Sequence, residues 1–115
     1  MSLAKLFRLF QPVELLQTPG HTWETETAWL RQHHPRRMAR IRGSVERHGI
    51  LEPIRLCYGD PACGTDLHVV DGHHRAVIAQ ELGIKRVPVA DAWDGSDWWL
   101  HVPDEQQEDP EEWAR

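Results

Sequence analysis

The segment Asp71–Arg75, with the sequence DGHHR, holds the densest group of residues that can do chemistry in this chain. An apolar run ends at Val70 just before it, and a run of helical character follows it. The start of a helix leaves backbone N–H groups unpaired and carries partial positive charge, so an anion bound there meets several donors at once. A glycine permits close backbone approach or a positive φ, and a guanidinium can add a bidentate contact. The sequence therefore predicts a phosphate site formed by Gly72, His73, His74 and Arg75.

The same segment contains candidate catalytic groups. Asp71, His73 and His74 can orient a ligand, move a proton or bind a metal ion. Adjacent residues at a helix start point in different directions, so we expect no metal site built by the protein alone. Mg²⁺ bridging a bound nucleotide is the expected ion, because it keeps several waters and uses few protein ligands. The structural alternative is that His74 and Arg75 only cap and brace the helix.

Three blocks of the sequence resemble ParB-like domains of the ParB/sulfiredoxin superfamily. Val69–Val89 is similar to the core motif of these domains, Ile41–Leu56 to their helix, turn and following strand, and Phe10–Thr18 to their opening strand. The resemblance covers about residues 8–92. It implies that a nucleotide such as CTP, ATP or ADP binds with Mg²⁺ at Gly72–Arg75, with nucleotide hydrolysis, phosphotransfer or nuclease activity as the reactions to expect.

The chain departs from two branches of this superfamily. Partitioning ParB proteins carry GERRxRA where His73 and His74 follow the glycine here, and this difference argues against a CTP-operated clamp. Sulfiredoxins carry a cysteine at the position of His73, so reduction of a sulfinic acid is not expected. The resemblance also implies a catalytic carboxylate from the region after the first strand or helix. The candidates for it are Glu24, Glu26 and Glu52.

Charge is unevenly distributed along the chain. Residues 1–59 hold nine Lys and Arg against five Asp and Glu, and residues 60–115 hold four against thirteen. The arginines of the first half can face a nucleic-acid backbone, or they can form an ordinary solvated helix face. The alternative function is therefore a non-catalytic ParB-like module that binds DNA through this patch, or a protein partner or second copy of the chain. The patch consists of Arg31, Arg36, Arg37, Arg40, Arg42 and Arg47.

The periodicity and turn residues predict one α/β domain of the α+β type, with helices packed on a small mixed sheet. We expect this ParB/sulfiredoxin-like domain over residues 1–92 and a Trp-containing acidic extension, partly disordered, over residues 93–115. The predicted elements are an N-terminal arm, a strand at Val13–Leu16, a short helix capped by Thr22 or Thr25, helices at Pro35–His48 and His73–Leu82, and strands at Ile50–Leu56, Leu67–Val70 and Ile84–Val89.

The composition predicts a soluble, cytoplasmic protein. No apolar stretch approaches the roughly 20 residues that span a bilayer, and Met1–Phe10 lacks the features of a secretory leader. Cys57 and Cys63 flank a turn-like segment, and we expect them to be reduced, with a zinc contribution or a disulfide as alternatives. The eleven arginines beside two lysines are typical of a GC-rich genome, which favours a bacterial or phage origin.

Overall fold

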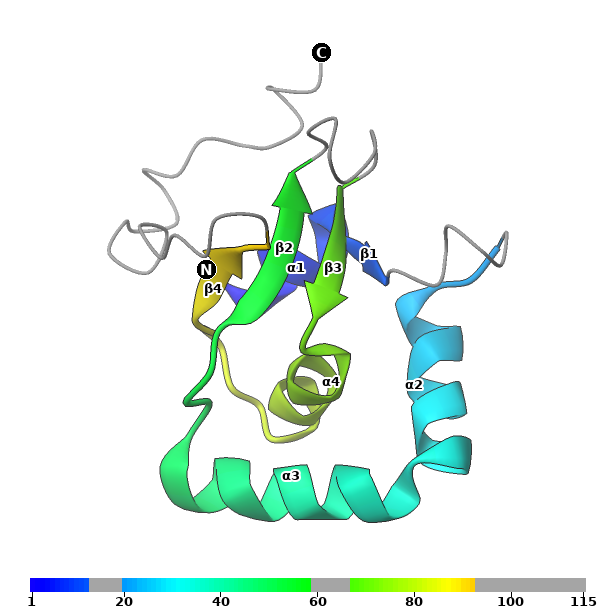
Figure 1. The fold of residues 1–115 in the computed structure, drawn as a ribbon, viewed down its shortest axis with the longest axis vertical. Helices are drawn as coiled ribbons and strands as arrows, with labels where there is room; N and C mark the ends of the chain where they lie inside the picture. The colour runs from blue at the N-terminus through cyan, green and yellow to red at the C-terminus, as the bar shows by residue number, and fades with distance from the viewer. Residues whose placement is uncertain (13–19, 59–66, 93–115) are drawn as a thin grey trace.

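The computed structural model describes residues 1–12, 20–58 and 67–92 of the chain. Within these ranges the chain forms four helices and a four-stranded mixed sheet (Figure 1), which confirms the predicted α+β class. No helix in this part of the protein has the length and apolar content needed to cross a membrane. The predicted strand at Val13–Leu16, the residue Cys63 and the acidic extension lie outside the described residues.

The sheet has the strand order β1-β3-β2-β4. Its central pair, β2 and β3, is antiparallel, and Leu56 lies opposite Val69 in their register. The two outer strands each run parallel to their neighbour, so the sheet is mixed. The strands are β1 (Gln11–Pro12), β2 (Ile54–Tyr58), β3 (Leu67–Asp71) and β4 (Val89–Asp91).

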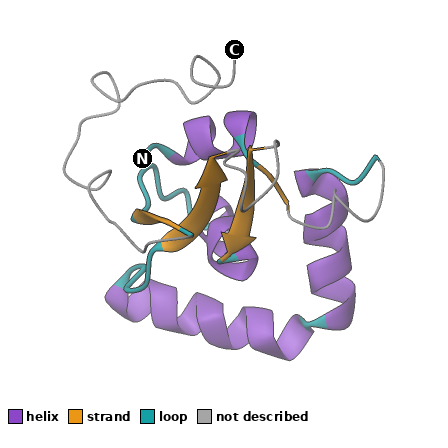
Figure 2. Cartoon of the chain, turned by 45° about the horizontal axis from the view of Figure 1, so that its top comes forward, coloured by secondary structure: helices purple, strands orange, loops and turns teal. Residues whose placement is uncertain are grey.

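One helix occupies the centre of the molecule, between the sheet and a second helix layer (Figures 1 and 2). In this helix Ala76 and Ala79 belong to the core shared with the sheet, whereas Val77 and Ile78 belong to a second core. Four consecutive buried residues are typical of a helix covered on all sides. The helices are α1 (Leu3–Leu9), α2 (Trp23–His33), α3 (Pro35–His48) and the central α4 (His73–Glu81).

The predicted N-terminal arm is wrong, because this segment forms the helix α1. The Ser2 side chain caps it by accepting a hydrogen bond from the Lys5 N–H at 3.2 Å. Leu3, Leu6 and Leu9, spaced three residues apart, are buried against the sheet core. A hydroxyl cap followed by apolar residues at helical spacing is a signal for a helix start, and Ser2 with these leucines provides it here.

The other boundaries agree in part with the sequence. Helix α3 spans the predicted Pro35–His48, and α4 begins at the predicted His73. Strand β2 begins at Ile54 instead of at residue 50, and β4 begins at Val89 instead of at residue 84. In addition, α3 packs on α4 rather than on the sheet. Met38 and Val45 of α3 lie in the second core, which also contains Val77 and Ile78 of α4. Cys57 is buried and has a free thiol.

Candidate functional site

A tight turn at Gly72 joins β3 to α4. Gly72 has φ of 102° and is the N-cap of the helix, without a side-chain cap. A Cβ atom at this position would lie 3.0 Å from Arg75 Nη2 and 3.2 Å from Ile54 Cγ1. The positive φ and the close approach of neighbouring side chains each favour glycine. The turn therefore has the properties that the sequence predicts for Gly72.

Arg75 folds back over this turn and braces it. Its Nη1 donates to the Glu52 carbonyl oxygen at 3.0 Å and lies 3.4 Å from Glu52 Oε2, while its Nη2 lies 3.4 Å from Asp71 Oδ2. The Arg75 side chain is only 16% exposed, whereas the Glu52 and Asp71 side chains are 85% and 65% exposed. The structure thus brings three predicted site residues together, with Arg75 placed as in the bracing alternative.

The two histidines of the segment point to different neighbours. His74 Nε2 lies 3.1 Å from Nδ1 of His34, and the two rings stack with centroids 5.3 Å apart. His73 instead contacts Trp23, with ring centroids 5.8 Å apart. His34 is the N-cap of α3, so the stack links the start of α3 to the start of α4. The described residues contain no group of three or more His, Cys, Asp or Glu placed to hold a metal ion.

The pKa of His74 is lowered from 6.5 to about 4, first by burial and then by the charges of Arg37, His34, His73 and Arg75. The imidazole is therefore neutral at pH 7. The sequence placed Arg37 in the basic patch but gave no signal that its charge acts on His74.

The pKa of His74 makes the protein less stable in acid. Because the unfolded chain takes up this proton near pH 6.5 and the folded protein only near pH 4, the free energy of unfolding should fall as the pH drops through this window. His74 is only partly buried, so solvent screening limits the loss to about 1–2 kcal/mol. Urea unfolding at pH 7.5 and pH 4.5 measures it. Between these two pH values the free energy of unfolding of the variant His74→Gln should fall by about 1–2 kcal/mol less than that of the wild type. An identical fall in both proteins would contradict the lowered pKa of His74.

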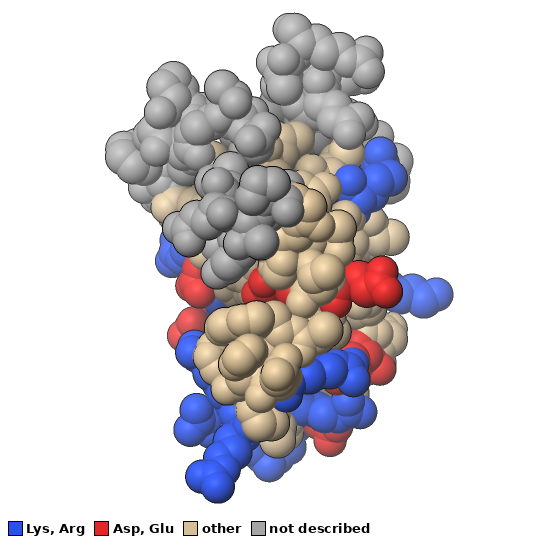
Figure 3. All heavy atoms as spheres, turned by 90° about the vertical axis from the view of Figure 1, so that its right-hand side faces the viewer, with Lys and Arg blue, Asp and Glu red and all other residues tan. Residues whose placement is uncertain are grey.

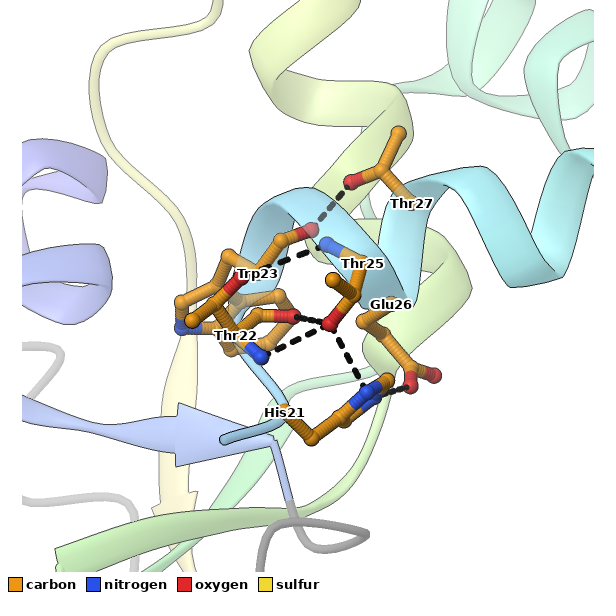
Figure 4. Close-up of polar contacts among 6 residues, drawn as sticks. All are labelled: His21, Thr22, Trp23, Thr25, Glu26 and Thr27. Atoms are coloured by element: carbon orange, nitrogen blue, oxygen red, sulfur yellow. Dashed lines mark hydrogen bonds and ion pairs between the residues drawn. The ribbon is translucent and has the colours of Figure 1, made fainter. Parts of the chain in front are cut away.

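A second polar cluster lies at the start of α2 (Figure 4). Glu26 is only 3% exposed, and its Oε2 lies 2.5 Å from His21 Nε2. The other ring nitrogen of His21 lies 2.8 Å from the Thr25 hydroxyl, which forms a capping box with Thr22. Of the three candidates for the single carboxylate that the resemblance implies, Glu26 is the buried one, and Glu24 and Glu52 are exposed. Nothing in the local sequence distinguishes Glu26 from Glu24.

The predicted arginine patch divides into two groups. Arg31 and Arg42 both form ion pairs with Glu81 of α4, and Arg42 also pairs with Glu46. The remaining four are exposed on α3 and form no ion pair with the described residues; Lys and Arg atoms gather at this end of the molecule (Figure 3). These four, which we call the α3 arginines, are Arg36, Arg37, Arg40 and Arg47.

Comparisons of the chain with protein-family models, with curated proteins and with solved structures found no match. The resemblance to ParB-like domains therefore stays a prediction, and the functional argument depends on the geometry of the site.

Proposed function

We propose that this domain binds the phosphate of a nucleotide at the start of α4, beside His34, Arg37 and His74. The observation that carries the proposal is a helix start without a side-chain cap, where His34 at the start of α3 stacks on His74 and the Arg37 and Arg75 guanidinium groups act on the His74 imidazole. An anion placed there interacts favourably with these guanidinium groups and with the positive end of the helix dipole. The neutral His74 ring can contribute a donor or an acceptor, according to its tautomer.

Arg75 has a supporting role in this proposal. Its guanidinium lies close to Gly72, and it forms ion pairs with Asp71 and Glu52 beside that turn. Carboxylates of this kind are the ligands that Mg²⁺ takes when it bridges nucleotide phosphates. The donor set thus fits a magnesium-nucleotide, with Asp71 and Glu52 as the residues that would hold the ion.

Phosphate binding also prepares His74 for proton transfer. With a pKa of about 4, its imidazole is a weak base at neutral pH. A bound anion stabilises the imidazolium and so raises this pKa toward the working range. Hydrolysis or phosphotransfer would then use His74 as the proton acceptor only when the ligand is present.

The α3 arginines favour a second candidate function, binding to a polynucleotide. Arg36, Arg40 and Arg47 lie at helical spacing on one face of α3, and all three are exposed. Gly43 lies on the same face, where a Cβ would be 3.8 Å from Arg47 Nη1. A glycine inside a helix costs about 1 kcal/mol relative to alanine, and here it leaves room for close approach of a ligand backbone. A row of unpaired guanidinium groups can neutralise successive phosphates.

One set of variants separates the two functions. In the nucleotide proposal, Arg37→Gln should weaken a magnesium-nucleotide roughly tenfold to a hundredfold, whereas the matched variant Arg36→Gln should leave it unchanged. Calorimetry with CTP, ATP, ADP, GTP and AMP, with and without Mg²⁺, measures this. Binding should also raise the pKa of His74, followed by NMR of its ring protons.

The outcome for a DNA duplex distinguishes the alternative. A polynucleotide on the α3 arginines should lose affinity in both Arg36→Gln and Arg37→Gln and should weaken steeply with salt. Absence of binding by every nucleotide, together with an unchanged pKa of His74, would exclude the nucleotide site. If Arg36→Gln, Arg37→Gln and the wild type all bound DNA with equal affinity, the second candidate function would be excluded.

A further inference from the structure

An apolar groove separates α1 from the segment that follows α4. Its volume is about 490 Å³, and its walls include Leu3, Ala4 and Phe7 of α1 with Gly83 and Ile84 on the other side. Small-molecule sites in proteins have volumes of about 300–1,000 Å³, so the groove has room for such a ligand. None of the residues proposed to bind phosphate lines it.

The walls of this groove are held in place by hydrogen bonds and packing. The Leu3 N–H donates to the Lys85 carbonyl at 2.9 Å, and the Ile84 N–H donates to the Ala79 carbonyl at 3.0 Å. The ring of Phe7 packs edge-on against Trp23, with centroids 4.7 Å apart. Because these backbone groups are already bonded, the walls present almost only apolar surface. A ligand that fits them must be mainly apolar as well.

The charge at the groove selects one kind of head group. Among the described residues that line the groove, Lys85 alone carries a charge, and it is exposed and forms no ion pair with the described part of the chain. The polar side chains of Ser2 and Gln80 also belong to this lining. A ligand with an anionic end therefore finds a cation here.

We propose that this groove binds a free medium-chain carboxylate. Its alkyl chain lies along Leu3, Phe7 and Ile84, and its carboxylate lies at Lys85. The chain is stabilised by removal of apolar surface from water, and the head group by attraction to the ammonium. This site is separate from the phosphate site, and the proposal does not depend on the proposed function.

Calorimetry with three amphiphiles that share a ten-carbon chain, each below its micelle concentration or solubility limit, tests the proposal. Decanoate should bind, decanol should bind roughly tenfold more weakly, and decyltrimethylammonium should give no binding heat. Lys85→Gln should weaken decanoate roughly tenfold and leave decanol unchanged. Lys5→Gln is the matched control, because Lys5 lies on α1 without lining the groove, and it should bind decanoate like the wild type.

A second variant blocks the groove itself. Ala4 is exposed on α1, so Ala4→Trp fills the groove without entering the core and should abolish decanoate binding. Decanoate bound with wild-type affinity by Lys85→Gln would overturn the proposal, as would equal binding of decanoate and decyltrimethylammonium. Association with anionic lipid vesicles in the absence of decanoate binding would also overturn it. The variant Arg37→Gln, which tests the proposed phosphate site, should bind decanoate like the wild type. The decanoate result therefore holds even if no nucleotide binds at the phosphate site.

Discussion

Replacing Gly72 with alanine should lower the free energy of unfolding by about 3 kcal/mol. Two effects add at this position. An alanine at φ of 102° is strained, and its Cβ would lie 3.0 Å from the Arg75 guanidinium and 3.2 Å from Ile54. Ile54 is fully buried in the sheet core and cannot move away freely. Urea unfolding at pH 7.5 measures the loss.

Gly83→Ala is the matched control for this prediction. Gly83 also has a positive φ, 72°, but a Cβ there would meet nothing within 4 Å. This variant therefore carries the backbone strain without the close contact, and it should cost about 1 kcal/mol. Equal losses in the two variants would show that the contact with Arg75 and Ile54 contributes nothing. In the proposed function, Gly72→Ala should also weaken nucleotide binding, because it displaces the brace.

Replacing His21 with alanine should lower the free energy of unfolding by about 3 kcal/mol. His21 Nε2 is the partner of Glu26 Oε2 at 2.5 Å, and the Glu26 side chain is only 4% exposed. A carboxylate can only accept hydrogen bonds, so it needs a donor when water is excluded. The variant leaves this group buried without that donor, and removing one partner of a buried pair is among the costliest single changes.

A double variant separates this cause from loss of packing. Adding Glu26→Gln to His21→Ala should recover part of the stability, because a neutral amide is less costly to bury than a carboxylate. Glu24→Gln is the control on the same turn; Glu24 is exposed, so its effect should stay within a few tenths of a kcal/mol. If the double variant were less stable than His21→Ala, the loss in His21→Ala would not come from leaving the Glu26 carboxylate without its hydrogen-bond partner.

The elements that could be predicted are those whose signals are local. Pro35 at the first turn of α3 and Gly49 after its end define a helix within a few residues, and the structure has the same bounds. The sequence also places Gly72 between an apolar strand and a helix, where a glycine permits close backbone approach or a positive φ, and the structure has both. Near α1 the sequence predicted an arm, and the cap by Ser2 that starts this helix was not used in that prediction.

The sequence by itself determined the fold class, the bounds of α3, the start of α4, and the residue types gathered at Gly72. These depend on backbone sterics and capping, which act between residues a few positions apart. Only the tertiary structure decided that His74 meets His34 across 40 residues, that Arg75 binds Glu52 instead of standing free, and that Glu26 is buried while Glu24 is exposed. The physical reason is that α4 packs between two cores, and the position of each side chain around it depends on every element that covers it.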